Sequence, residues 1–131
     1  MKHLNDYTEK PINALFDKYG AFYAFSNEQF RERAIKAIKY CKVGMGLILP
    51  KIHFEKFQDE YLQIIKECIQ KDIDENGLDN IIERELANHE CYYTYNYNEI
   101  NFLDALKDYP ITKDDIKRVF HATYDKHAEN F

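Results

Sequence analysis

A carboxylate and an imidazole stand four residues apart in this sequence, at Glu85 and His89, close enough to touch on a helix. Residues 79–97 are expected to be helical, and their periodicity makes an apolar stripe of Leu78, Ile82, Leu86 and Tyr93. Glu85 and His89 project into that stripe, where polar side chains must find partners or destabilise the fold.

Three interpretations of this pair follow from its surroundings. The first is a buried structural pair that helps to specify the core. The second is a binding pocket or partner surface that also uses Asn88, Tyr92 and Tyr93. The third is a metal site with these ligands: His89 with Glu85 or Glu90, completed by His53 or His121. A catalytic zinc ion needs three protein ligands, and the sequence has no HExxH spacing, so we assign neither a metal nor a cofactor.

Four tyrosines follow the pair in the six-residue stretch 92–97: Tyr92, Tyr93, Tyr95 and Tyr97. Exposed tyrosines give a large contact area at low entropic cost and are enriched at interfaces. Acidic neighbours such as Glu90 and Glu99 would steer this strip towards a basic groove. Cys91 is expected opposite the apolar stripe and exposed, and its spacing of two from His89 does not favour a nucleophile pair.

The composition sets wider limits. The chain has 131 residues, 45% of them hydrophobic, which fits one folded domain. The net charge of −5 argues against direct, non-specific binding to nucleic acid. Three widely spaced cysteines predict a reducing, cytoplasmic setting, and no stretch has the length of a membrane span.

The pattern along the chain predicts one compact, mostly α domain of five or six helices over residues 11–131, after a polar lead-in at 1–10. The expected helices are 11–19, 27–40, 54–75, 79–97, 99–108 and one that begins after Thr112. Ser26, Asn98 and Thr112 are the expected N-caps. Residues 42–49 are expected to be extended, residues 21–25 are either helical or extended, and the acidic run 71–75 is expected to face solvent.

Two segments carry a resemblance: LFDKYGAFYAFSNEQF at 15–30 and RELANHECYYT at 84–94, with KVGMGLILPK between them. Together they resemble a family of small uncharacterised proteins carried by bacteriophages and mobile elements. The resemblance covers roughly residues 12–120 and implies a phage or mobile-element origin. It implies no catalytic activity.

Two classes of function remain. The first is a non-enzymatic protein-binding module, such as an inhibitor of a host defence machine that targets nucleic acid, with a host protein as its partner. Its binding residues would be Glu85, Asn88, His89, Glu90, Tyr92, Tyr93, Tyr95 and Tyr97. The alternative is a small metal- or ligand-dependent enzyme, or a ligand binder, that uses Glu85 and His89. The oligomeric state does not follow from the sequence.

Overall fold

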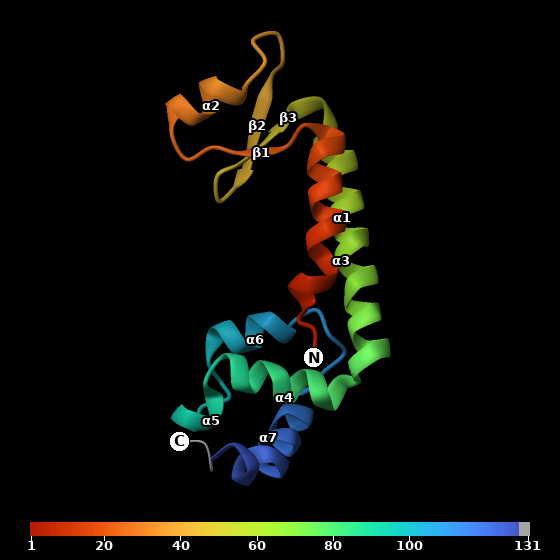
Figure 1. Cartoon of the computed structure of the whole chain (residues 1–131), viewed down its shortest axis with the longest axis vertical. Coiled ribbons are helices and arrows are strands. Elements are labelled where there is room, and N and C mark those ends of the chain that lie inside the picture. Colours follow the sequence, from red (N-terminus) through yellow and green to blue (C-terminus); the bar gives the residue numbers. More distant parts are fainter. Residues whose placement is uncertain (129–131) are drawn as a thin grey trace. The chain divides into compact units, whose positions relative to one another are not determined.

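A computed structural model describes residues 1–128 of the chain (Figure 1). The elements in chain order are α1 (Leu4–Tyr19), β1 (Phe22–Tyr23), α2 (Asn27–Arg33), β2 (Tyr40–Gly44), β3 (Leu47–Pro50), a 3-10 turn η1 (Lys51–His53), α3 (Phe54–Asn76), α4 (Leu78–Asn88), α5 (Cys91–Thr94), α6 (Ile100–Leu106) and α7 (Lys113–Ala128). The prediction of a mostly α fold is confirmed, with seven α-helices over the described residues instead of five or six.

Contacts within the chain group into two compact units, residues 2–68 and residues from 69 onwards. We call them the N-terminal unit and the C-terminal unit and describe each by itself. The single domain expected over 11–131 stays a prediction. None of the helices within residues 1–128 combines the length and the apolar character needed to cross a membrane.

The N-terminal unit contains an antiparallel sheet in the order β1-β3-β2. The extended segment predicted at 42–49 is confirmed, because β2 and β3 form a hairpin there. Gly44, Met45 and Gly46 all have positive φ, so the two glycines make the tight turn possible. Of residues 21–25, which the sequence left open, Phe22 and Tyr23 form β1.

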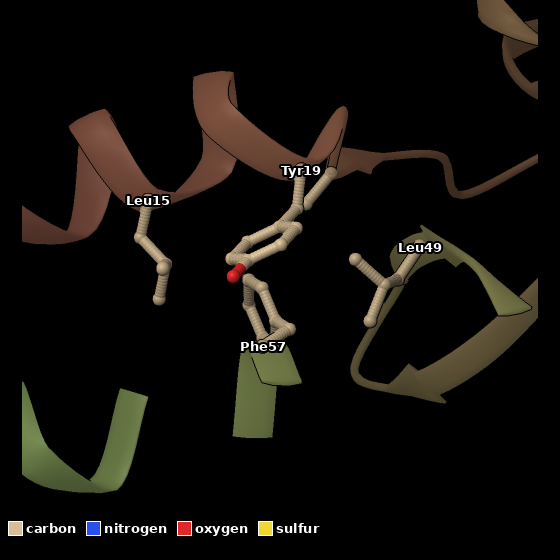
Figure 2. Packing of buried hydrophobic residues seen from close by; sticks show 5 residues of the cluster. Leu15, Tyr19, Leu49 and Phe57 are labelled. Carbon is tan, nitrogen blue, oxygen red and sulfur yellow. The ribbon is translucent and has the colours of Figure 1, made fainter. Parts of the chain in front are cut away.

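The sheet is covered on both faces, because neighbouring strand residues point to opposite sides. On one face, Leu49 packs with Leu15 and Tyr19 of α1 and Phe57 of α3 (Figure 2). On the other face, α2 covers the sheet through a cluster of aromatic rings: Phe22, Phe30 and Tyr40. Figure 1 shows the sheet between α2 and the helices α1 and α3.

Helix α1 runs antiparallel to α3, since Tyr7 lies near Cys68 and Lys18 lies near Glu60. The predicted helix start is wrong: α1 begins at Leu4, within the segment expected to be a polar lead-in, and Pro11 is inside the helix rather than at its first turn. Pro11 has no N–H for the carbonyl four residues earlier, which belongs to Tyr7. The thiol of Cys68 donates to that carbonyl at 3.4 Å, so the neighbouring helix supplies the missing hydrogen bond.

Helix α2 is much shorter than predicted. The Ser26 cap is confirmed, with its Oγ accepting from Gln29 N at 3.1 Å. The helix ends at Arg33 rather than at residue 40, because Tyr40 is taken into strand β2, opposite Pro50. The apolar residues that appeared to continue the helical pattern beyond residue 33 therefore lie in the following loop and in strand β2.

The C-terminal unit is helical over its described residues, and α4 contacts α5, α6 and α7. Its core includes Ile81, Ile82, Leu86, Cys91, Phe102, Leu106, Ile116, Val119 and Phe120. The expected long helix from 54 to about 75 is confirmed as α3. The Thr112 cap is confirmed by reciprocal bonds with Asp115, whereas Glu99, not Asn98, caps α6 through bonds from Asn101 N and Phe102 N.

Candidate functional site

The stretch that carries the predicted site is not one helix. Helix α4 ends at Asn88, and Glu90 has a φ of 57°. The short helix α5 ends at Thr94 and is followed by Tyr95, which has a φ of 52°. This break shifts the helical phase, so Tyr93 is 72% exposed and Cys91 is fully buried, the reverse of what the sequence predicts. The prediction assumed one unbroken helix with 100° of rotation per residue, whereas Glu90 has a left-handed backbone conformation.

Glu85 and His89 are brought together as their spacing predicts. His89 Nε2 lies 3.5 Å from Glu85 Oε2, and its other ring nitrogen lies 3.9 Å from Glu99 Oε2. Glu85 is buried, and its second oxygen accepts from Arg84 Nε at 2.9 Å. Both carboxylate oxygens of Glu85 are thus directed at cations or potential cations of the same unit.

A larger polar network extends from this pair. The guanidinium of Arg84 makes two parallel hydrogen bonds to Asp72, at 2.9 and 3.0 Å. Asp72 also accepts from Tyr109 Oη at 2.5 Å and from Asn76 Nδ2 at 2.7 Å. The side chain of Asp72 is 0% exposed, and that of Arg84 is 5% exposed. Helix α3, helix α4 and the turn before Pro110 therefore meet in one hydrogen-bonded network, and the Glu85–His89 contact extends it to the end of α4.

The electrostatics of this network favour its charged form. Burial raises the pKa of Asp72, but hydrogen bonds from Arg84, Tyr109 and Asn76 outweigh burial and hold that pKa below its usual value. Burial lowers the pKa of Arg84, but its bonds to Asp72 and Glu85 more than compensate and raise that pKa. Burial and the bond to Asp72 both raise the pKa of Tyr109, which therefore stays a hydrogen-bond donor.

Asp72, Arg84 and Tyr109 were not among the predicted site residues. Asp72 lay in the acidic run expected to face solvent, and for this residue the expectation is wrong. The available signal was its spacing: Asp72 follows Cys68 by four and Ile69 by three, on the buried stripe of the long helix. Nothing in the spacing of Arg84 or Tyr109 identifies them as partners of this carboxylate.

The four tyrosines divide into two pairs. Tyr92 is buried, and its ring centroid lies 4.1 Å from that of His127, on which it stacks. Its hydroxyl shares a 2.5 Å hydrogen bond with the hydroxyl of Thr123, and burial raises the pKa of Tyr92 to about 12. Tyr97 is half-buried, with its ring 4.7 Å from that of Phe120. Tyr93 and Tyr95 are exposed, at 72% and 56%. Tyr92 and Tyr97 thus belong to the packing, whereas Tyr93 and Tyr95 expose more than half of their surface.

The remaining predicted residues lie at the surface of the same stretch. Asn88, the last residue of α4, and Glu90 are both exposed. Over residues 1–128, no three His, Cys, Asp or Glu side chains are grouped closely enough to hold a metal ion. Burial raises the pKa of Cys91 to about 11, so its thiol is a poor nucleophile at neutral pH.

The chain was also compared with known proteins. A model of a family of unknown function, DUF7659, matches residues 4–126. No curated protein and no solved structure gives a significant match. The match extends over nearly the whole chain and includes both units, the buried network and the exposed tyrosines. The chain therefore belongs to the DUF7659 family, whose function is unknown.

Proposed function

We propose that this protein is a non-enzymatic protein-binding module, and that Tyr93 and Tyr95 are part of its recognition surface. The observation that carries the proposal is the exposure of these two large aromatic side chains, 72% and 56%, two residues apart. Aromatic side chains of this size usually bury most of their surface, and exposed tyrosines are the side chains that interfaces favour.

The backbone supports the same assignment. Glu90 and Tyr95, on either side of α5, both have positive φ, which costs about 1–2 kcal/mol for a residue with a side chain. Strain of this kind gathers at functional sites. The ring of Tyr95 also lies edge-on against Phe120 and Tyr124, at 5.0 and 5.1 Å, so part of the surface is already ordered before a partner arrives.

The polar network supports a role without catalysis. The carboxylates of Glu85 and Asp72 and the guanidinium of Arg84 satisfy one another within the C-terminal unit. Groups paired in this way position helices and specify the core, whereas a general base needs its lone pair directed at a substrate.

Charge supports a basic partner. Residues 69–131 carry fourteen of the twenty-three acidic residues and only seven lysines and arginines. The net negative charge of this segment would steer a basic surface towards it and would make association weaken as salt rises. A phage or mobile-element origin is part of this proposal. The support for that origin is the resemblance of the two segments 15–30 and 84–94. On that basis the partner is a host protein in the bacterial cytoplasm, such as a defence complex that acts on nucleic acid.

The proposal is tested by capture from a nuclease-treated bacterial lysate on the immobilised chain, followed by mass spectrometry and measurement of the partner's affinity. Tyr93→Ala and Tyr95→Ala should each weaken binding by more than about 1 kcal/mol if these residues are hot spots. Tyr23→Ala is the matched control, since Tyr23 is also an exposed tyrosine but belongs to the N-terminal unit. If only the control variant loses the partner, the recognition surface is elsewhere.

A further inference from the structure

The net charge of −5 conceals an uneven distribution. Residues 31–51 carry six of the chain's eighteen lysines and arginines and one acidic residue, Glu32. All six cations are exposed. The expectation that the chain avoids nucleic acid rested on the total charge, which the acidic C-terminal unit dominates. The N-terminal unit has to be judged by its own charges.

Two of these cations oppose each other across the sheet. Lys51 N donates to Lys39 O at 2.9 Å, which extends the β2–β3 pairing by one residue and places the two lysines directly opposite each other. Like charges at such positions destabilise a sheet. Because Tyr40 faces α2, the alternation along β2 directs Lys39 and its neighbour Lys51 to the opposite face, so the two lysines add to the positive potential of this unit without lining the cleft on the α2 side.

A cleft of about 600 Å³ lies on the α2 side of the same sheet. It opens between the start of α2 and strands β2 and β3, and Lys42 contributes its positive charge to the wall. Most other wall residues are apolar or aromatic: Ala24, Phe25, Phe30, Ile38, Tyr40 and Ile48. The cleft thus combines a cation with flat aromatic surfaces.

Phe25 is 74% exposed at this cleft, yet its surroundings hold it in place. Its ring covers Gly46 so closely that a Cβ there would lie 2.3 Å from a ring carbon. Its backbone N–H donates to Gln29 Oε1 at 2.7 Å, and its ring stacks nearly parallel to that of Tyr23, with a 3° interplanar angle. Phe25 is therefore an ordered aromatic platform at the surface.

We propose that this cleft binds single-stranded nucleic acid, with a base stacked on Phe25, a phosphate facing Lys42 and the rest of the backbone held by the positive potential of residues 31–51. Single strands supply a flat base and a negative charge at every nucleotide, which is the combination that stacking platforms with basic flanks bind. An acidic peptide matches the cations but offers no repeating flat ring for the platform. This inference uses none of the residues of the proposed protein-binding surface.

The test is fluorescence anisotropy of the full chain with a fluorescein-labelled 12-nucleotide oligothymidine. With three phosphate contacts, affinity should fall about 20-fold between 50 and 200 mM salt. Phe25→Ala should weaken binding about 5-fold or more, while Phe25→Tyr retains the ring and should bind as the wild type does. Lys42→Gln should reduce the logarithmic salt slope by about 0.7.

Two control variants are Ile100→Ala, an exposed apolar side chain, and Lys113→Gln, an exposed cation, both in the C-terminal unit. Both should bind oligothymidine as the wild type does, and circular dichroism confirms that each variant is folded. Three results would overturn the proposal: no binding at 50 mM salt, equal binding by Phe25→Ala, or equal affinity for a duplex of the same length. Binding of a polyglutamate peptide in place of the oligonucleotide would also overturn it, in favour of an acidic protein ligand.

Discussion

Replacing Asp72 by Asn tests the role of the buried network most severely. The change keeps the side-chain volume but leaves the guanidinium of Arg84, 5% exposed, without its bidentate anion. Breaking a buried ion pair from one side costs about 3–5 kcal/mol. Because Arg84 keeps its 2.9 Å bond to Glu85, we expect the lower end, about 3 kcal/mol. A domain of this size has a free energy of unfolding of about 5–15 kcal/mol, so the loss is large.

The measurement is urea unfolding followed by circular dichroism, with a thermal scan in which the midpoint should fall by roughly 10 °C. Asp74→Asn is the matched control, since Asp74 lies on the same helix but is exposed and bonds only Gln70 among the contacts described. The control should change the free energy of unfolding by less than about 0.5 kcal/mol. If Asp72→Asn costs less than about 1 kcal/mol, the network does not hold the C-terminal unit together, and our reasoning fails.

Three further predictions concern other parts of the chain. Gly46→Ala should destabilise the protein more than Gly20→Ala in urea unfolding. Both glycines have positive φ, but only at Gly46 would the new Cβ collide with the ring of Phe25. Equal losses of stability would contradict this. With a thiol reagent at pH 8, half-buried Cys41 should react first, while Cys91, whose pKa is raised to about 11, should react only after unfolding. Because the pKa of Asp72 is lowered in the fold, its stabilisation is present above the unfolded pKa of about 3.9 and is lost as pH falls through the folded pKa. The stability difference between wild type and Asp72→Asn should therefore shrink below about pH 4, and a constant difference down to pH 2 would refute this assignment.

Local signals predicted the parts of the fold that local interactions determine. The Ser26 and Thr112 caps and the long helix ending before Gly77 were all readable, because a cap and its partner lie within a few residues. The extended hairpin was readable from Gly44 and Gly46. The end of α2 at Arg33 could not be predicted from local signals. It depends on the pairing of strand β2 with β3, which takes Tyr40 out of the helix.

The candidate site shows the same division. The contact between Glu85 and His89 follows from their spacing, whereas the partnership of Arg84 with Asp72 joins residues twelve apart on two helices. The exposure of Tyr93 depends on one backbone conformation, the positive φ of Glu90, which no side-chain pattern indicated. Burial of Tyr92 followed from the same break, so the strip that the sequence predicts contains both buried and exposed tyrosines.

Hydrogen exchange of the chain with and without its captured partner tests the central claim most directly. If Tyr93 and Tyr95 form the recognition surface, exchange should slow in the segment around them, residues 91–97, when the partner binds. Tyr93→Ala should remove this protection at the same partner concentration and leave the exchange of the free chain unchanged. Protection that is confined to residues 2–68, or that persists in the variant, would contradict the account.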